Sequence, residues 1–448
     1  MRIAFFAVLH PVRSGISDYC EHLLPELEKL IDVDVFIDDY SREDVSSRIR
    51  SEVFNYLRFE HMHKARRYDA IVYQMGNDLH HRFMYHYIFN FPGILVLHDF
   101  NLHPSRASML RSTRDEATYT EELRACLGAG RGAEVARLIL ADRRFSPLLD
   151  IFPMNELALH KSRAAIVHNP YVKKAIEEAI PGTPAYLLNM GIPMHSEVPK
   201  KAQARGNLDL PLGKFIVLHP GFAGAHRKPE VALDGFARLL ERHPNAILLF
   251  VGAPDPNVDI KAMIERRGLD RSVILKDYVT DRTFLMCIAA ADVVLNLRNN
   301  KIRETSATML TAMSLGRPVI ATRLVHNCHL SPEICTFVEH SPTESEDLAA
   351  AMGRLWSNPK EGESIGSAAR EYVRREHSIQ QAAAGYKHVV AEVTSSPESA
   401  TKRARSLHER ISWLDEETNL IAGGLCGQDD SGTVADELRR AIEDLGLA

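Results

Sequence analysis

The sequence predicts two doubly wound α/β domains in tandem, followed by a polar tail. The chain has 448 residues, which is too long for one compact α/β domain and suits two. Short apolar runs alternate with helical patterns, as in a parallel sheet covered on both faces. This alternation stops at 193–211, a polar stretch bounded by prolines, and then starts again.

The first domain opens with short runs rich in β-branched and aliphatic residues, as burial on both faces of a sheet requires. We expect strands at 3–8, 33–37, 70–74, 94–98 and 164–168. Between the first two runs, Ile16, Tyr19, Leu23 and Leu27 follow helical spacing, although Pro25 conflicts with an uninterrupted helix.

The second domain repeats the pattern, with strands expected at 215–218, 247–251, 273–275, 293–297 and 319–321. The resulting division is an N-terminal domain at 1–195, a linker at 196–212, a C-terminal domain at 213–377, a closing helix at 378–394 and a weakly ordered tail at 395–448. The carboxyl ends of both sets of strands are expected to face one cleft, where ligands bind.

Composition excludes several classes of protein. Hydrophobic residues make up 45% and charged residues 25%, as in soluble globular proteins. The net charge of −5 argues against nucleic acid as a partner. No apolar run reaches the ~20 residues that span a bilayer. The N-terminus lacks the pattern of a signal peptide, and six scattered cysteines indicate reduced thiols, so we expect a cytoplasmic protein. Peripheral membrane contact and the oligomeric state remain open.

The loop after the first strand, residues 10–18, contains Gly15 at the start of a helix. Free backbone amides and the helix dipole at such a turn attract an anion. The alternative is a tight turn that merely needs a glycine. The loop lacks the G-x-G-x-x-G spacing, which counts against dinucleotide binding.

The loop at 221–228 follows the first strand of the second domain and combines glycine with positive charge. Gly221 permits close approach of the backbone, and Arg227 with Lys228 supplies cations. This combination suits a diphosphate whose departure must be stabilised.

Residues 296–306 follow another buried strand and lead into a helix. Glu304, Thr305 and Ser306 place a carboxylate, hydroxyls and free amides at its N-terminus. Helix capping is the simpler interpretation. The functional interpretation, a carboxylate that contacts sugar hydroxyls, is compatible with it and is favoured by the position at a strand end.

Ordered motifs in both domains resemble the family four retaining glycosyltransferases, which have the GT-B fold of two Rossmann-like domains. The similarity extends over roughly residues 1–393. The motifs that carry it are 13–19, 73–77 and 96–99 in the first domain, and 250–256, 277–279, 291–298, 304–306 and 312–320 in the second.

The resemblance implies roles for individual residues. On the catalytic side it places His98 near the transferred sugar, Arg227 and Lys228 at the leaving phosphates, and Glu304 at the sugar hydroxyls. It implies that the donor is bound by Gly15, Gly221, Tyr278, Val279, Arg298, Thr305, Ser306, Ala307 and Thr311, with the backbone at 278–279 holding the nucleobase. The acceptor-side residues are Asp18, Asn77 and Asp99. His98 alone is otherwise read as a satisfied histidine at a strand end.

Two positions depart from the family pattern. Many members have a second glutamate, which binds the donor ribose, and this chain has Thr311 at that position. Many members also have an arginine at the position where this chain has Phe222. Glu304 also sits one residue out of step with that pattern. In retaining members no protein nucleophile is expected, because the donor's own phosphate oxygen accepts the acceptor's proton.

The expected function is therefore transfer of a hexose from a nucleotide-diphosphate sugar to a saccharide, lipid or small-molecule acceptor. No cofactor and no metal are expected, because Arg227 and Lys228 carry the charge. Two alternatives stay open: a nucleotide-sugar epimerase with the same fold, and a non-catalytic protein that binds nucleotide sugars. The sequence leaves the sugar, the nucleobase and the acceptor open, and 101–153 is the segment where acceptor choice is expected.

Overall fold

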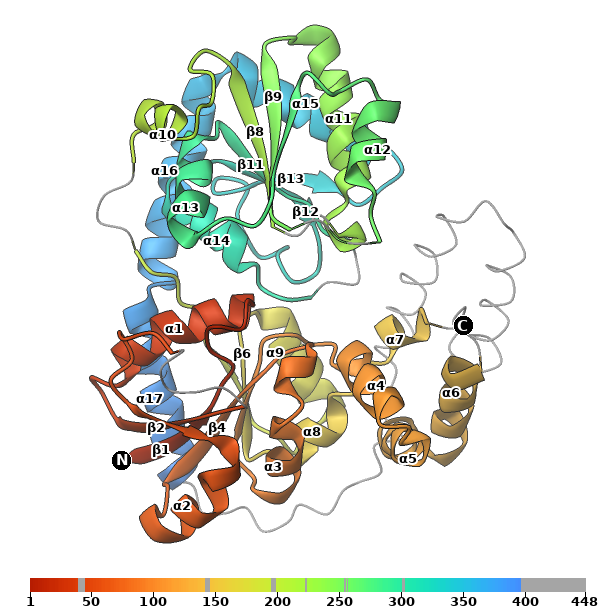
Figure 1. The fold of residues 1–448 in the computed structure, drawn as a ribbon, viewed down its shortest axis with the longest axis vertical. Coiled ribbons are helices and arrows are strands. Elements are labelled where there is room, and N and C mark those ends of the chain that lie inside the picture. The colour runs from red at the N-terminus through yellow and green to blue at the C-terminus, as the bar shows by residue number, and fades with distance from the viewer. Residues whose placement is uncertain are drawn as a thin grey trace. The chain divides into compact units, whose positions relative to one another are not determined.

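The computed structural model describes residues 1–38, 45–141, 146–194, 199–221, 224–253, 255, 257–299 and 303–395. They form two compact units, shown in Figure 1. The first unit holds residues 1–191, 303–305 and 379–395, and the second holds 192–302 and 306–378. The chain passes between the units at 191–192 and 378–379, and also on either side of residues 303–305. The expected tail, beyond Ser395, lies outside the described residues.

The first unit is built on a parallel sheet of seven strands in the order β3-β2-β1-β4-β5-β6-β7. The inner strand β1 pairs with β2 and β4 and is buried from Ile3 to Phe6. The strands are β1 (Arg2–Phe6), β2 (Asp32–Ile37), β3 (Glu52–Asn55), β4 (Ala70–Met75), β5 (Ile94–Leu97), β6 (Ala164–Val167) and β7 (Ala185–Leu187).

Helices cover this sheet because each strand returns to the next by a crossover. They are α1 (Gly15–Leu27), α2 (Phe59–Arg66), α3 (Met84–Asn90), α8 (Glu156–His160), α9 (Pro170–Ala179) and α17 (Ile379–Ser395), with short 3-10 turns η2 (Tyr56–Arg58) and η3 (Leu79–His81). Helix α1 continues through Pro25 to Leu27. Helix α17 packs against α1 and β4 and so returns the end of the described chain to the first unit.

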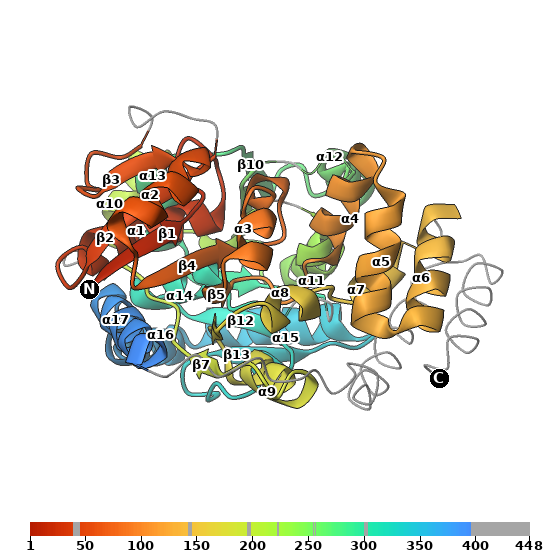
Figure 2. The ribbon, with the colours of Figure 1, turned by 90° about the horizontal axis from the view of Figure 1, so that it is seen from below.

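Four helices between β5 and β6 form a separate group. They are α4 (His103–Ser112), α5 (Glu116–Leu127), α6 (Ala129–Ala141) and α7 (Leu148–Ile151). Figures 1 and 2 show α4, α5 and α6 packed side by side, away from the strands of their unit. The group has a hydrophobic core of its own, in which Tyr119, Leu123, Val135 and Phe152 are fully buried. It occupies the segment where acceptor choice is expected.

The second unit has a parallel sheet of six strands in the order β10-β9-β8-β11-β12-β13. The strands are β8 (Phe215–Pro220), β9 (Ala246–Val251), β10 (Val273–Lys276), β11 (Val293–Asn296), β12 (Val319–Arg323) and β13 (Thr336–Glu339). The helices are α10 (Lys201–Asn207), α11 (Pro229–Arg242), α12 (Ile260–Arg266), α13 (Asp281–Ala290), α14 (Ala307–Ser314), α15 (Glu344–Ser357) and α16 (Pro359–Glu376), with the 3-10 turn η5 (Ala225–Arg227).

The segment expected to be a linker contains a packed helix. Arg205 of α10 is buried and donates to the carbonyl of Ala290 over 3.0 Å and to the carboxylate of Asp292 over 2.6 Å. These bonds attach α10 to the second unit. The prolines and lysines of this segment predicted a linker. The buried Arg205, which holds α10 in place, gives no periodic pattern in the sequence.

The doubly wound α/β class is confirmed in both units, and each of the expected strands is present. The sequence missed β3, β7 and β13, which all lie at the edges of their sheets. Edge strands are only partly buried, as in β3 and β7. They therefore lack the continuous apolar run that marks a central strand.

Candidate functional site

In each sheet the winding of the chain reverses beside the first strand, and several of the predicted residues lie near that point. In the second unit the chain winds one way from β8 to β10 and the other way from β11 to β13. The point of reversal lies between β8 and β11, whose carboxyl ends lead to Gly221 and Arg298. In the first unit the reversal lies between β1 and β4. Ligands of doubly wound sheets bind at such points.

Arg298, which is buried, and Arg227, which is partly buried, are two interacting cations at the reversal in the second unit. Arg227 donates to the carbonyl of Pro220 over 3.3 Å, and its guanidinium covers Gly221. Gly221 has φ of +93°, and a Cβ there would lie 2.6 to 2.9 Å from three guanidinium atoms. Burial, and then the charge of Arg298, lower the pKa of Arg227 well below its ordinary value. An anion between the two guanidinium groups would offset both the loss of solvation and the repulsion between their positive charges.

The start of α14 adds a third positive element to this pair. Ser306 is the N-cap, and its Oγ accepts from the backbone N–H of Met309 over 3.2 Å. The same Oγ lies 3.3 Å from Nη2 of Arg298 and 2.9 Å from Nδ2 of Asn296. The capping interpretation therefore holds for Ser306. The first amides of α14, beginning at Ala307, open beside a guanidinium, and a helix N-terminus favours anions.

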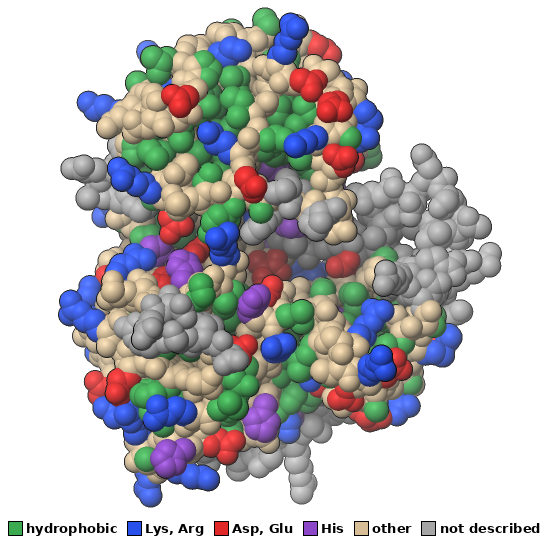
Figure 3. All heavy atoms as spheres, in the orientation of Figure 1, with side chains coloured by type: hydrophobic (Ala, Val, Ile, Leu, Met, Phe, Trp, Pro, Cys, Tyr) green, Lys and Arg blue, Asp and Glu red, His purple; other side chains and the backbone are tan. Residues whose placement is uncertain are grey.

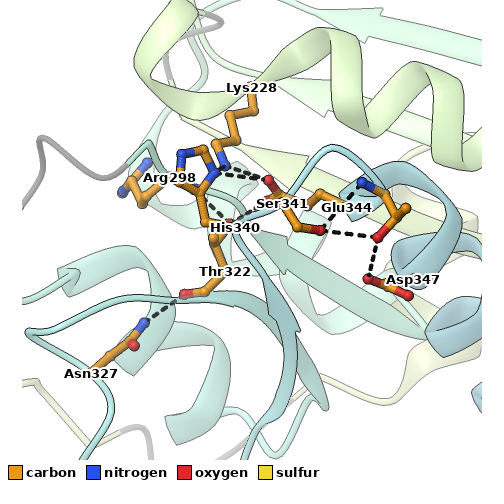
Figure 4. A network of polar contacts seen from close by, with 9 residues as sticks. Lys228, Arg298, Thr322, Asn327, His340, Ser341, Glu344 and Asp347 are labelled. Carbon is orange, nitrogen blue, oxygen red and sulfur yellow. Dashed lines mark hydrogen bonds and ion pairs between the residues drawn. The ribbon is translucent and has the colours of Figure 1, made fainter. Parts of the chain in front are cut away.

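Lys228 is adjacent to Arg227 in sequence but its side chain has other partners. Its Nζ lies 2.5 Å from Oε2 of Glu344 and 2.6 Å from Nδ1 of His340, as Figure 4 shows. Its backbone is left-handed, with φ of +51°, at the N-cap of α11. Burial lowers the pKa of Lys228, and Glu344 opposes that shift. The sequence expected two equivalent cations, whereas the structure shows Lys228 in a buried ion pair.

In the first unit, Gly15 is the first residue of α1 and lies in open surroundings. Ser14 caps the helix by accepting from the N–H of Ser17 over 3.0 Å. A Cβ on Gly15 would have no heavy atom within 4 Å outside its chain neighbours and its own helix backbone. Asp18 in the next turn bonds Nε2 of His10 over 2.7 Å. A hollow of about 420 Å³ adjoins this turn; it is lined by Pro11, Val12, Arg13, Ser14, Asp78 and His80.

Two acidic side chains interact beyond β5 of the first unit. Oδ2 of Asp99 accepts from the backbone N–H of Asn77 over 2.6 Å, and Oδ1 of Asn77 accepts from the N–H of Ser105 over 2.9 Å. Burial raises the pKa of Asp99. Burial, and then the charge of Asp99, raise the pKa of Glu304 to about 7. Glu304 therefore keeps its proton to a higher pH than an ordinary glutamate does.

Glu304 reaches Asp99 because residues 303–305 belong to the first unit. Asn169 donates to the carbonyl of Arg303 over 2.9 Å, and Thr305 donates to the carbonyl of His168 over 2.9 Å. The guanidinium of Arg303 lies 5.5 Å from the ring centre of Phe100. Glu304 and Thr305 precede Ser306, the N-cap of α14, and they belong to the first unit while Ser306 belongs to the second.

His98 is buried in a polar cluster of the first unit. Its Nε2 lies 2.8 Å from Oε1 of Gln74, and its ring contacts those of Tyr19 and His168 at 5.1 and 4.9 Å between centres. Oε1 of Gln74 also accepts from the hydroxyl of Tyr386 over 3.4 Å. Burial, followed by His168, lowers the pKa of His98 well below its ordinary value. His98 is therefore neutral, and donation to Gln74 leaves its Nδ1 without a proton.

The residues expected at the nucleoside lie apart from these groups. Tyr278 is 45% exposed and follows β10 with Val279, at the carboxyl end of an edge strand. The hydroxyl of Thr311 donates to the carbonyl of Ala307 over 2.9 Å, one turn back in α14. Phe222 lies outside the described residues.

Several residues of these clusters were not identified from the sequence. Gln74 and Tyr386 connect to His98, while Thr322, His340 and Glu344 connect to Lys228. A glutamine inside an otherwise apolar strand is the one signal that marked Gln74. His340 and Glu344 lie more than a hundred positions from Lys228, and Tyr386 lies more than three hundred from Gln74, so no local pattern reports these contacts.

Other features lie outside these clusters. A second hollow, of about 470 Å³, lies in the helical group and is lined by Pro104, Ala107, Ser108, Arg111, Ile139, Ser146 and Leu149. Within the described ranges, no group of three or more His, Cys, Asp or Glu side chains is arranged to hold a metal ion. None of the helices in that part of the chain has the length and apolar character needed to cross a membrane. Figure 3 shows acidic and basic side chains interspersed on the visible face.

Two such doubly wound units in one chain define the GT-B fold, and solved structures share it along almost their whole lengths. Sucrose-phosphate synthase from Thermosynechococcus elongatus has a TM-score of 0.62 at 18% identity, covering 88% of this chain and 98% of that one. Anabaena HepE, in complex with UDP and glucose, has a TM-score of 0.62 at 16% identity, covering 88% and 100%. A glycosyltransferase from Rickettsia africae has a TM-score of 0.63 at 13% identity, covering 88% and 99%. These similarities establish the fold.

Residues 215–358 match the family model described as Glycosyl transferases group 1. The match begins at β8 and ends just after α15, so it spans Gly221, Arg227, Arg298 and Ser306. A comparison with curated proteins gives no significant match. The cation pair therefore lies inside the part of the chain that matches a glycosyltransferase family.

Proposed function

We propose that this protein is a retaining glycosyltransferase that moves a hexose from a nucleotide-diphosphate sugar to a saccharide, lipid or small-molecule acceptor. The GT-B fold and the family match at 215–358 support the general class. The observation that carries the proposal is the pair of cations beside the N-terminus of α14, the partly buried Arg227 and the buried Arg298.

The cation pair suits the leaving group of this reaction. When the bond between sugar and diphosphate breaks, negative charge develops on the phosphate oxygens. Arg227, Arg298 and the first amides of α14 supply positive charge at one point of the second unit. Because these groups are already fixed in place, they stabilise the developing charge without reorganising. Gly221 lets the guanidinium of Arg227 lie directly against the backbone of the loop.

The first unit supplies groups for the sugar and the acceptor. A neutral His98 offers a hydrogen-bond acceptor at Nδ1, and a protonated Glu304 can donate to a sugar hydroxyl. Gly15 leaves the N-terminus of α1 open to a phosphate. In this proposal no protein nucleophile is used, and the donor's phosphate oxygen accepts the acceptor's proton as the new bond forms on the same face. Catalysis then consists of positioning and charge stabilisation.

Acceptor choice is assigned to the helical group α4–α7. It is inserted between β5 and β6, directly after His98 and Asp99, and the bond from Ser105 to Asn77 ties its first helix to that corner. The hollow of about 470 Å³ in this group supports the assignment.

The experiment measures binding and transfer with a panel of UDP-, GDP- and ADP-sugars. UDP-glucose is tested first, because the structurally similar HepE has been solved with UDP-glucose. Wild type is expected to bind one nucleoside diphosphate and to transfer or slowly hydrolyse the corresponding sugar. NMR of the product should show the donor's anomeric configuration. Inversion would contradict the retaining mechanism, epimerisation without an acceptor would indicate the epimerase, and binding without turnover would indicate a non-catalytic protein.

Arg227→Ala is the decisive variant. It is expected to weaken binding of the nucleoside diphosphate at least about tenfold, because a hydrogen bond to a charged group is worth 1.5–3 kcal/mol. Arg238→Ala is the control, since Arg238 lies on α11 in an exposed pair with Glu346. Lys228→Ala is less informative, because it leaves Glu344 buried without its cation, a loss of about 3–5 kcal/mol. Unchanged binding by Arg227→Ala would remove the assignment of the diphosphate site.

A further inference from the structure

Glu344 connects the two loops that carry the cations of the second unit. It is the first residue of α15, and its side chain is 3% exposed. Its Oε2 accepts from Nζ of Lys228 over 2.5 Å, and its Oε1 accepts from Oγ1 of Thr322 over 2.9 Å. Oγ1 of Thr322 in turn accepts from the backbone N–H of Arg298 over 3.2 Å. Figure 4 shows this chain of contacts.

His340 accepts one of the three N–H bonds of the Lys228 ammonium group. An ammonium can only donate, so Nδ1 of His340, at 2.6 Å, accepts from it. His340 then carries its proton on Nε2, and its Nδ1 cannot also donate to Oε2 of Glu344, 3.2 Å away. Two of the three N–H bonds of Lys228 are therefore directed at His340 and Glu344. The third is left for another acceptor.

The same two loops are also joined directly, because the backbone N–H of Asn299 donates to the carbonyl of His226 over 3.1 Å. Lys228 ends the loop after β8 and has left-handed backbone geometry, which a lysine adopts only when its surroundings hold it. Arg298 begins the loop after β11. The loop after β8 carries the guanidinium of Arg227, which directly precedes Lys228. The loop after β11 carries the guanidinium of Arg298. The distance between these guanidinium groups thus depends on what holds the loops together.

We infer that Glu344 is a positioning residue that fixes the separation of Arg227 and Arg298 by holding Lys228 directly and the Arg298 backbone through Thr322. This inference rests on the proposed function of the cation pair. The phosphate is consequently bound by the two arginines, with Lys228 contributing its remaining N–H.

Thr322→Val tests the inference without disturbing the ion pair. The variant keeps the shape of the side chain and removes the hydroxyl that links Glu344 to Arg298. Thr336→Val is the matched control, because Thr336 is a buried threonine on the neighbouring strand β13 whose Oγ1 accepts from Arg354 over 3.4 Å. Calorimetric Kd values for UDP, GDP and ADP, together with the thermal midpoint, are measured for each protein.

Thr322→Val removes the hydrogen bonds to Glu344 and from the N–H of Arg298, and it is expected to raise the Kd of the nucleoside diphosphate that wild type binds best by about fivefold to tenfold. Thr322→Ser, which restores the hydroxyl, is expected to recover the wild-type Kd. Thr336→Val should leave the Kd unchanged even where its thermal midpoint falls as much as that of Thr322→Val. Glu344→Gln is expected to weaken binding further.

The outcomes separate the two proposals. If wild type binds a nucleoside diphosphate and Thr322→Val binds it equally well, the positioning role of Glu344 is overturned while the proposed function stands. If Thr322→Val and Thr336→Val weaken binding equally, the effect is general loss of stability and the inference is also overturned. Failure of wild type to bind UDP, GDP or ADP overturns the proposed function itself, and with it the inference.

Discussion

The carboxyl group of Asp99 and burial together raise the pKa of Glu304 to about 7. The N–H of Asn77, 2.6 Å from Oδ2 of Asp99, favours the charged form of that residue, so the proton of the pair resides on Glu304. A carboxyl group that keeps its proton near neutral pH can donate a hydrogen bond. At an active site such a group suits recognition of hydroxyls.

The raised pKa of Glu304 makes the free energy of unfolding depend on pH. In the unfolded chain Glu304 loses its proton near pH 4.5, whereas in the folded chain it keeps the proton to about pH 7. The folded state therefore binds more protons between these values, and stability falls as pH rises through this window. The shift corresponds to about 3 kcal/mol. Glu304→Gln, which does not titrate, should therefore gain stability relative to wild type from pH 5 to pH 8.

The measurement is urea unfolding of wild type and Glu304→Gln across that range. Glu241→Gln, on an exposed position of α11, is the control and should follow the wild-type curve. We also expect Glu304→Gln to lower the rate of transfer at least about tenfold, since the site loses its titrating carboxyl group. Stability and activity would then change in opposite directions. Parallel pH curves for wild type and Glu304→Gln would contradict the assigned pKa.

The sequence located the ends of the central strands well but not the partners of the side chains there. Arg227 and Lys228 are adjacent and carry the same charge, so sequence alone treated them as one basic pair. Their different surroundings come from Glu344 and His340, more than a hundred positions away. Glu304 and Ser306 were likewise grouped because they are close in sequence, yet they belong to different units.

Gly15→Ala separates a requirement of the fold from a requirement of the ligand. Because no heavy atom outside its immediate surroundings lies within 4 Å of the new Cβ, the fold should tolerate the change. Alanine at a helical position is expected to stabilise by about 0.5–1 kcal/mol. Transfer should nevertheless fall about tenfold or more if a phosphate approaches this turn, because the methyl group would occupy its place.

Gly130→Ala provides the matched control for that experiment. Gly130 also lies in the first turn of a helix, α6, and its Cβ would likewise meet nothing within 4 Å. It should share the gain in stability and keep full activity. Equal activity of the two variants would show that the donor does not contact Gly15.

Removal of divalent metal tests whether the arginines replace a metal ion. Arg227, Arg298 and the N-terminus of α14 together supply the positive charge that Mg²⁺ supplies in many phosphate sites. We therefore expect the transfer rate in excess EDTA to stay within about twofold of the untreated rate. Loss of activity that Mg²⁺ or Mn²⁺ restores would show that the charge of the arginines is insufficient.

Gly221→Ala tests the contact between the backbone and Arg227. Gly221 has φ of +93°, so any side chain is strained there, and a Cβ would lie 2.6 Å from Cζ of Arg227. The variant must displace the guanidinium from its place over the loop. We expect a loss of stability of about 1–3 kcal/mol from the backbone and a rise in the Kd for the nucleoside diphosphate of about tenfold or more from the displaced arginine.

Gly268→Ala separates these two effects. Gly268 also has a left-handed backbone, with φ of +63°, but a Cβ there would meet no heavy atom within 4 Å. The control should lose about 1–2 kcal/mol of stability through backbone strain alone and keep the wild-type Kd. A weaker Kd in Gly221→Ala but not in Gly268→Ala therefore isolates the position of Arg227. If both variants bind the nucleotide as wild type does, Arg227 does not bind the phosphate from the place where it covers Gly221.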